Sequence, residues 1–208
     1  MAKRKRPTRK HTPQAGGRVA PVGLRIVGGR LRGRKLSYGG DMRVRPMKDR
    51  TREAVFNLLG PAVKGMQAID LFAGTGAMAL EAISRGAVRA IMIERHLPTA
   101  RVIRENIAAV GADAECQVVS ADAFRWAAEQ PQSDGTPWVV ICCPPYEFFV
   151  DRQEKMLELI RTMFEVAPPQ STIVVESDDR FDHELLPDPD QWDSRRYAPA
   201  IVGIRRKP

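Results

Sequence analysis

Short apolar runs alternate with longer amphipathic stretches along the chain from residue 67 onward. The apolar runs AIDLF, AIMIE, CQVVS, WVVICC and TIVVES begin at residues 68, 90, 116, 138 and 172. The stretches AMALEAISRG, PTARVIRENIAAVG, AFRWAAEQ and RQEKMLELIRTMFEV lie between them and repeat their apolar residues at helical spacing. This alternation predicts parallel strands joined by helices, which is an α/β fold with helices on both faces of one sheet.

The C-terminal segment adds two strands to this sheet. SRRYAPAIVGIRRKP, from residue 194 to residue 208, alternates around a turn near Pro199. We expect this pair to be antiparallel, so that the complete sheet has seven strands and is mostly parallel. The segments 131–137 and 181–193 are rich in Pro and Asp and are interpreted as loops.

The N-terminal quarter predicts a small extension of one hairpin and one helix. LRIVGGRLRGRKL, residues 24–36, alternates apolar and basic residues, and its turn is expected at Gly28 and Gly29. Apolar residues then recur at helical spacing in the segment 43–59. We therefore divide the chain into a basic tail (1–22), which we expect to be disordered, the extension (23–60) and the α/β domain (61–208).

Positive charge is concentrated in this N-terminal quarter. Residues 1–52 contain 17 Lys and Arg but two acidic residues, a net charge of +15, whereas the rest of the chain carries −7. Lys and Arg that neutralise phosphates release condensed counterions, so this asymmetry favours a polyanionic partner. The alternatives are a solvated tail and a solvated basic face. The cations around the start of the predicted helix oppose its dipole, which favours phosphate binding there.

Length and cysteine content exclude several classes of protein. With 208 residues the chain can bury a core without disulfides or metals. Its cysteines number three, which is odd, and they lack C-x-x-C spacing, so we expect no disulfide framework. Neither His96 nor His183 belongs to a metal-ligand sequence pattern, so we also expect no metal site. The sequence shows neither a signal-like apolar run nor a membrane span, which favours a cytoplasmic protein.

A glycine-rich loop follows the first apolar run. The segment DLFAGTGAMA spans Asp70 to Ala79, and Gly74 and Gly76 would let a ligand approach the backbone at the start of a helix. This loop alone also fits the dinucleotide-binding pattern, so a nicotinamide-dependent oxidoreductase is a competing interpretation. Asp70, four residues before Gly74, suits an amino-acid ammonium better than a pyrophosphate.

Two further acids lie at the end of the second apolar run and just after the third. Glu94 stands where an acidic side chain can bind both hydroxyls of a ribose, and Asp122 is placed to accept from an adenine amino group. Either residue could instead be a solvated acid or a helix cap. Together with Asp70 and the glycine loop, they describe a crevice for an adenosine that carries an amino-acid tail, which is S-adenosylmethionine.

These motifs resemble a known family. DLFAGTG, the acids at 94 and 122 and PPY after the fourth apolar run resemble the class I, Rossmann-like methyltransferases that act on amino groups of nucleic acids. RIVGGRLRGRKL, RVRPMKDRTREAVFNLL and DLFAGTGAMALEAISRGA are similar to the RsmD family. The resemblance implies methyl transfer from S-adenosylmethionine to the N2 of a guanine in small-subunit ribosomal RNA. It also implies that the guanine leaves its stack and lies on the ring of Tyr146.

The chain departs from the family pattern at one position. Cys143 stands where the resemblance implies an Asp or Asn that orients the amino group, and a thiol is a weak acceptor. Backbone carbonyls could suffice for a slower enzyme. The protein could instead be an RNA-binding or ribosome-assembly factor with a residual cofactor site. A further alternative is that Cys143 is a nucleophile. Its position before the two prolines, next to Cys142, which we expect to be buried as an apolar residue, disfavours this role.

The resemblance therefore assigns three sets of residues. We expect the base site to contain Cys143, Pro144, Pro145 and Tyr146. We expect the cofactor to contact Asp70, Phe72, Gly74, Gly76, Glu94, Arg95, Asp122 and Ala123. We expect ribosomal RNA to contact Arg25, Arg30, Arg32, Arg34, Lys35, Arg43, Arg45, Lys48, Arg50 and Arg52. The expected partner is the small ribosomal subunit or an assembly intermediate, bound by a monomer.

Overall fold

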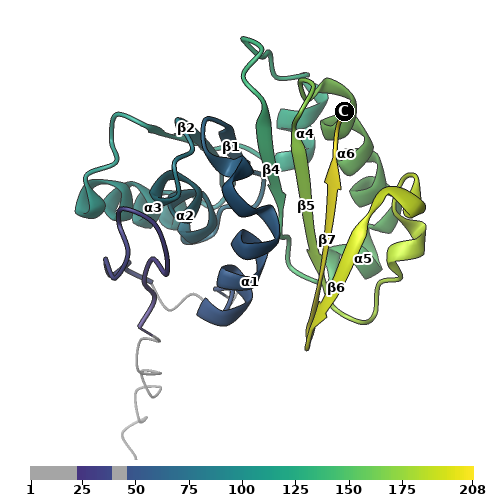
Figure 1. The fold of residues 1–208 in the computed structure, drawn as a ribbon, viewed down its shortest axis with the longest axis horizontal. Coiled ribbons are helices and arrows are strands. Elements are labelled where there is room, and N and C mark those ends of the chain that lie inside the picture. Colours follow the sequence, from purple (N-terminus) through teal and green to yellow (C-terminus); the bar gives the residue numbers. More distant parts are fainter. Residues whose placement is uncertain (1–22, 39–45) are drawn as a thin grey trace, which may run out of the picture.

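A single seven-stranded sheet organises the protein, in the order β3-β2-β1-β4-β5-β7-β6. The computed structural model describes residues 23–38 and 46–208. The first five strands are parallel, and β7 pairs antiparallel with β5 and β6 (Figure 1). The strands are β1 (Gln67–Asp70), β2 (Arg89–Ile93), β3 (Cys116–Val119), β4 (Trp138–Cys142), β5 (Thr172–Ser177), β6 (Asp193–Tyr197) and β7 (Ala200–Arg206). The predicted α/β fold and its antiparallel C-terminal pair are confirmed.

Helices cover both faces of the sheet. The helices α1 (Asp49–Leu59), α2 (Ala77–Ser84) and α3 (Leu97–Val110) pack on one face. The helices α4 (Ala123–Ala128), α5 (Phe148–Asp151) and α6 (Gln153–Val166) pack on the other face. Three 3-10 turns, Gly60–Val63, His183–Leu185 and Pro189–Gln191, lie in the connections. Apolar spacing did not predict α5 or the turns within 181–193, because each is a single turn or less.

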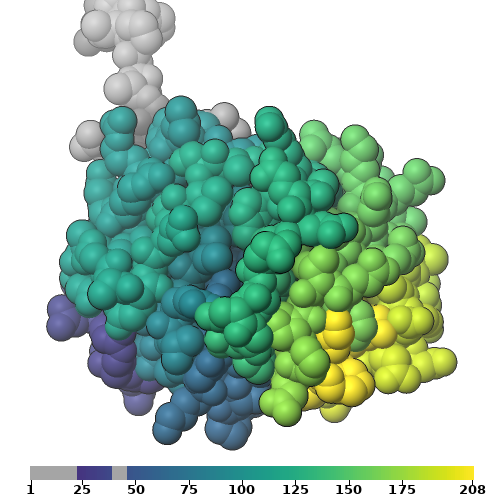
Figure 2. All heavy atoms as spheres, turned by 90° about the horizontal axis from the view of Figure 1, so that it is seen from above, coloured from purple at the N-terminus to yellow at the C-terminus, as the bar shows by residue number. Residues whose placement is uncertain are grey.

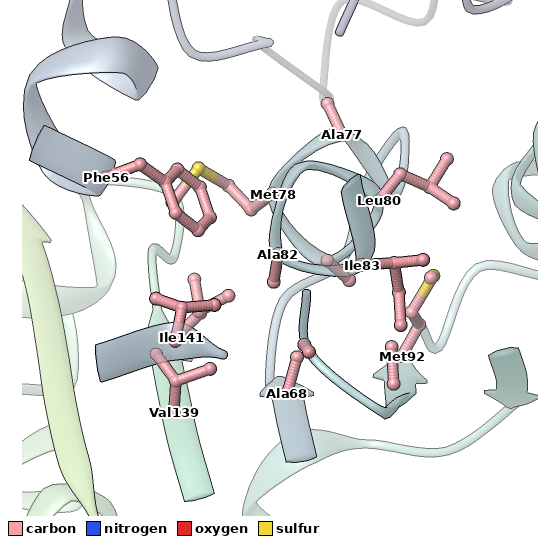
Figure 3. Packing of buried hydrophobic residues seen from close by; sticks show 14 of the residues in the cluster. Phe56, Ala68, Ala77, Met78, Leu80, Ala82, Ile83, Met92, Val139 and Ile141 are labelled. Carbon is pink, nitrogen blue, oxygen red and sulfur yellow. The ribbon is translucent and has the colours of Figure 1, made fainter. Parts of the chain in front are cut away.

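The alternation of strand residues places two cores on the two faces. Val139 and Ile141 of β4 face α1 and α2, whereas Val140 and Cys142 face α6. Figure 3 shows Phe56 of α1 beside Met78 of α2, above the β4 side chains. Because both faces are covered, the central strands are apolar at almost every position, which is why they read as continuous apolar runs.

The segment 24–36 folds back on itself with less strand pairing than predicted. Only Arg25 and Lys35 form an antiparallel bridge, and the bend spans residues 28–33 instead of a tight turn at Gly28 and Gly29. The cause is the end of α2: the Ser84 carbonyl accepts from Arg30 N at 2.7 Å. A Cβ on Gly29 would lie 1.9 Å from that carbonyl oxygen, so the close approach needs glycine.

Two parts of the sequence interpretation lie outside the described residues. These are the tail, residues 1–22, and the segment 39–45, which includes Arg43 and Arg45. Within the described ranges, no helix is long and apolar enough to cross a membrane.

Candidate active site

The carboxyl ends of the parallel strands bring the predicted site residues to one edge of the sheet. Asp70 is the last residue of β1, Glu94 follows β2 and Asp122 follows β3. Cys143 follows β4, and Glu176 lies near the end of β5. In an open α/β sheet this edge forms the crevice where ligands bind. The fold therefore gathers residues that are more than 100 positions apart in sequence.

The glycine loop wraps around the end of β1. Gly74 and Gly76 have φ angles of 53° and 77°, in the left-handed region that glycine tolerates best. A Cβ on Gly76 would lie 3.0 Å from Ile103 Cγ2, so this loop is also packed too closely for a side chain. Glu94 fixes the loop, because its Oε2 accepts from Gly74 N at 3.1 Å and its Oε1 accepts from His96 N at 2.8 Å.

Asp70 has a buried oxygen without a partner. Its side chain is 2% exposed, and among the described residues nothing donates a hydrogen bond to Oδ2. Burial raises the pKa of Asp70 from 3.8 to about 7, while the backbone N–H groups of Phe72 and Ala79 lower it in part. An unpaired buried carboxylate is costly, and a cationic group would satisfy it. This oxygen fits the ammonium group of an amino-acid ligand.

Asp122 caps a helix. Its Oδ1 accepts from Phe124 N at 3.0 Å and from Arg125 N at 3.3 Å, at the start of α4. Its Oδ2 lies 3.8 Å from Arg95 Nη1. One oxygen of Asp122 therefore caps the helix, as the sequence analysis allowed. The other oxygen faces Arg95 in the crevice.

Three aromatic rings lie beside Asp122. Phe72, Phe124 and Phe148 are half-buried, with ring centroids 5.9 to 6.2 Å apart. The guanidinium groups of Arg95 and Arg152 lie 5.8 and 4.6 Å from the centroid of Phe148. Such a group of rings and planar cations can hold a flat heterocycle. The sequence interpretation missed Phe124 and Phe148, although Phe124 lies two residues after Asp122 and Phe148 lies two residues after Tyr146.

The Pro-Pro-Tyr corner leads directly from β4 into α5. Pro144 is buried, Pro145 is exposed and the Cys143 thiol is half-buried. The Tyr146 hydroxyl donates to Glu176 Oε1 at 2.8 Å. Burial raises the pKa values of Cys143, Tyr146 and Glu176. A raised pKa disfavours the thiolate form of Cys143, which is the form that a nucleophilic role needs.

The basic side chains of the segment 24–36 are exposed. Arg25 and Arg30 are engaged in ion pairs with Asp49 and Glu115. Of the residues predicted to contact RNA, Arg32, Arg34, Lys35, Lys48 and Arg50 have no ion pair within the described residues, and all five are exposed. Figure 2 shows this segment, in purple, at the opposite side of the molecule from the yellow C-terminal strands. The described basic side chains of this segment thus lie at one end of the molecule.

The prediction that Arg52 belongs to this surface is wrong. Its side chain is fully buried, and its guanidinium donates to the Met47 carbonyl at 3.1 Å and to Asp49 Oδ1 at 2.8 Å. It also pairs with the buried Glu81. Arg52 lies two residues after the exposed Arg50, and with 3.6 residues per turn its side chain is on the opposite face of α1, toward the core.

The fold and the crevice define a class of protein. A seven-stranded sheet with an antiparallel β7 and a glycine loop after β1 is the Rossmann-like fold of class I methyltransferases. The solved structure of the putative methyltransferase yhhF from Escherichia coli superposes with a TM-score of 0.73 and 28% identity, over 88% of this chain and 97% of that one. A Thermus thermophilus 16S rRNA N2 methyltransferase in complex with AdoMet and guanosine has the same fold, with a TM-score of 0.60 and 22% identity over 75% and 41% of the two chains.

Sequence comparison narrows the class to a family. The family described as Conserved hypothetical protein 95, the RsmD family, matches residues 24–199, and the chain belongs to it. The ribosomal RNA small subunit methyltransferase D of Escherichia coli K12 is 39% identical over 124 residues, which cover 59% of this chain. The match spans 60% of that relative's length.

Proposed function

We propose that the protein transfers a methyl group from S-adenosylmethionine to the exocyclic N2 of a guanine in small-subunit ribosomal RNA, in the cytoplasm. The observation that carries the proposal is the buried, unpartnered Oδ2 of Asp70 at the same sheet edge as the Pro-Pro-Tyr corner. One half of this edge suits an amino-acid ammonium, and the other half suits a flat base. The names of the family's relatives support the reaction class.

The crevice residues have separate roles in holding the cofactor. Asp70 binds the ammonium group, and the loop with Gly74 and Gly76 lets the amino-acid portion approach the backbone. Glu94 binds the ribose hydroxyls, and Asp122 accepts from the adenine amino group through the oxygen that faces Arg95. Phe72 and its two aromatic neighbours border the adenine, together with Ala123. The cofactor supplies an electrophilic methyl group on a sulfonium sulfur.

The Pro-Pro-Tyr corner holds the guanine. The base leaves its stack and lies on the ring of Tyr146, whose hydroxyl is fixed by Glu176. Pro144 and Pro145 have no N–H groups, and their fixed φ angles hold the nearby carbonyl oxygens as acceptors for the amino group. Orientation of this amino group matters because its lone pair is delocalised into the base and must be directed at the methyl carbon.

The exposed basic side chains hold the RNA backbone. Five of them have no ion pair within the described residues, so they are free to neutralise phosphates. Arg25 and Arg30 would exchange an acidic partner for a phosphate. Arg43 and Arg45, which lie outside the described residues, are proposed to contact RNA as well. Arg52 is excluded from this role by its burial.

A second candidate function is RNA binding without methyl transfer. The half-buried Cys143 thiol favours this alternative, because it replaces the acceptor that the family pattern provides. Tight binding of the protein to small ribosomal subunits, without transfer of a methyl group, would support this second function.

The deciding experiment is transfer of labelled methyl from S-adenosylmethionine to small ribosomal subunits that lack the modification. Digestion to nucleosides then identifies the methylated atom. We expect N2-methylguanosine with the wild type and none with Tyr146→Ala, and naked RNA serves as a second substrate. Label on another base or atom, or no label with a folded protein that binds S-adenosylmethionine, would contradict the proposal.

A further inference from the structure

Glu176 lies beside Cys143 because of the register between β4 and β5. Cys142 pairs with Val175 in this parallel ladder, so the next residues, Cys143 and Glu176, are neighbours across the two strands. Both side chains project from the sheet face that carries α1 and α2, opposite to Cys142 and Val175. The position at which the family pattern has an Asp or Asn is therefore next to a carboxylate from the adjacent strand.

The hydrogen bond to Glu176 comes from the base site. Its Oε1 accepts from the Tyr146 hydroxyl at 2.8 Å. Burial raises the pKa of this carboxyl, and Tyr146 and the nearby Cys143 lower it in part. Glu176 is 7% exposed. Its carboxylate thus lies beside two of the residues that the sequence places around the guanine.

Glu176 has no cationic partner within the described part of the chain. The acids Asp70 and Asp178 are among the charged groups that act on Cys143 and Tyr146 beside it. A buried carboxylate that accepts a hydrogen bond from a phenol and has no cation beside it is poorly compensated. Stabilising the core does not explain a buried carboxylate at position 176. Binding a ligand that has N–H donors does explain it.

We propose that Glu176 is the carboxylate that accepts the N–H groups of the guanine and receives the proton released from N2. The inference rests on the proposed function of the site. Guanine presents N1–H and N2–H side by side, and a carboxylate can accept both. Adenine presents an acceptor at N1, which a carboxylate repels. Glu176 therefore both selects guanine and orients its amino group, which the Cys143 thiol cannot do.

The methyl transfer balances with this assignment. The N2 lone pair forms the new N–C bond, and the C–S bond breaks with its electron pair remaining on sulfur, so the sulfonium becomes a neutral thioether. N2 then carries one proton in excess, and the Glu176 carboxylate takes it. Burial raises the pKa of Glu176 above its usual 4.5, which makes the carboxylate a better proton acceptor near neutral pH.

The first test replaces the carboxylate by an amide. We expect Glu176→Gln to lower kcat about 10²- to 10³-fold, as for loss of a positioned hydrogen-bonding or proton-transfer group. We expect no change in S-adenosylmethionine affinity, measured by calorimetry, because Glu176 is not in the cofactor half of the crevice. Glu154→Gln, the same change at an exposed position of α6, is the matched control and should leave kcat unchanged.

The second test moves the carboxylate to the neighbouring strand. We expect Cys143→Asp in the Glu176→Gln background to recover at least about tenfold of the lost kcat, because an acid at 143 restores a carboxylate to the base site. A role of Glu176 in fixing Tyr146 alone predicts no such rescue. Full activity of Glu176→Gln, or a folded, cofactor-binding double variant that stays as inactive as Glu176→Gln, would overturn the inference.

A binding measurement separates failure of this inference from failure of the proposed function. If the wild-type protein methylates no RNA, the proposed function is contradicted. In that case the protein is titrated with GMP and AMP in the presence of S-adenosylhomocysteine. Preference for GMP in the wild type that disappears in Glu176→Gln upholds the recognition role, and equal affinity for both nucleotides overturns it.

Discussion

The guanidinium Nε of Arg52 lies 3.7 Å from Oε2 of Glu81, and both side chains are completely buried. The same Oε2 accepts from Val27 N at 2.8 Å, and Oε1 accepts from Arg85 Nε at 2.8 Å. The pair therefore connects the segment 24–36, α1 and α2. A buried ion pair of this kind holds the basic surface against the sheet domain without contributing to the surface itself.

Loss of Arg52 should destabilise the fold. Arg52→Met removes one of the two cations paired with the buried Glu81, together with the hydrogen bonds of Arg52 to Met47 and Asp49, and we expect the free energy of unfolding to fall by about 3–5 kcal/mol. Urea denaturation measures this change. Arg50→Met, at an exposed position of the same helix, should change it by less than about 0.5 kcal/mol. Equal effects of the two substitutions would show that the ion pair has no special role.

Loss of exposed cations should weaken RNA binding without affecting stability. Arg32→Gln together with Arg34→Gln removes two exposed charges that have no ion pair within the described residues. We expect the slope of log K against log salt to decrease by about 1.4–1.8, because each lost phosphate contact contributes about 0.7–0.9. Filter binding at several salt concentrations measures the slope. Lys155→Gln with Arg161→Gln, on the exposed side of α6, is the control pair, and an equal loss there would argue against a localised RNA surface.

Cofactor affinity should depend on the ionisation of Asp70. The pKa of this carboxyl is about 7, and only its ionised form attracts an ammonium group. We therefore expect affinity for S-adenosylmethionine to fall as pH decreases below 7, by up to about tenfold per pH unit. Asp70→Asn should bind weakly and lose this dependence. Calorimetry between about pH 5.5 and about pH 7 tests both statements, and a pH-independent wild-type affinity would contradict them.

A side chain at Gly76 should damage the glycine loop. Gly76→Ala combines a φ of 77° with a Cβ that lies 3.0 Å from Ile103 Cγ2. Gly111→Ala is a matched control, since its φ is 70° and nothing lies within 4 Å of the added Cβ. Both should lose about 1–2 kcal/mol to the left-handed conformation. Overpacking should cost Gly76→Ala about 1–3 kcal/mol more. Thermal unfolding compares them, and equal losses would mean that the loop tolerates the methyl group.

Restoring the family's acid at 143 should not increase activity while Glu176 is present. In Cys143→Asp the new carboxylate would neighbour that of Glu176 across β4 and β5. Repulsion between two adjacent negative charges disfavours ionisation of both groups. We expect kcat equal to or below that of the wild type. A large increase in kcat for the single variant would show instead that the thiol limits the reaction and that Glu176 does not replace the missing acceptor.

The sequence by itself determined the fold class and the edge of the sheet at which Asp70 and Glu94 lie. Continuous apolar runs such as WVVIC arise because β4 is covered on both faces, and the acids that follow such runs must meet at one edge of a parallel sheet. The positions of Asp70 and Glu94 at the ends of strands could therefore be predicted. These properties depend on local order along the chain, which the sequence displays directly.

Only the tertiary structure decided the partners of individual polar side chains. Glu176 reads in the sequence as the end of an apolar run, and its place beside Cys143 follows from the register of β5 against β4. Arg52 reads as one of several exposed cations, and its burial depends on the contact between α1 and α2. Strand register and helix packing join residues far apart in sequence. The pattern of apolar residues fixes which face of an element is buried, but not which charges meet across that face.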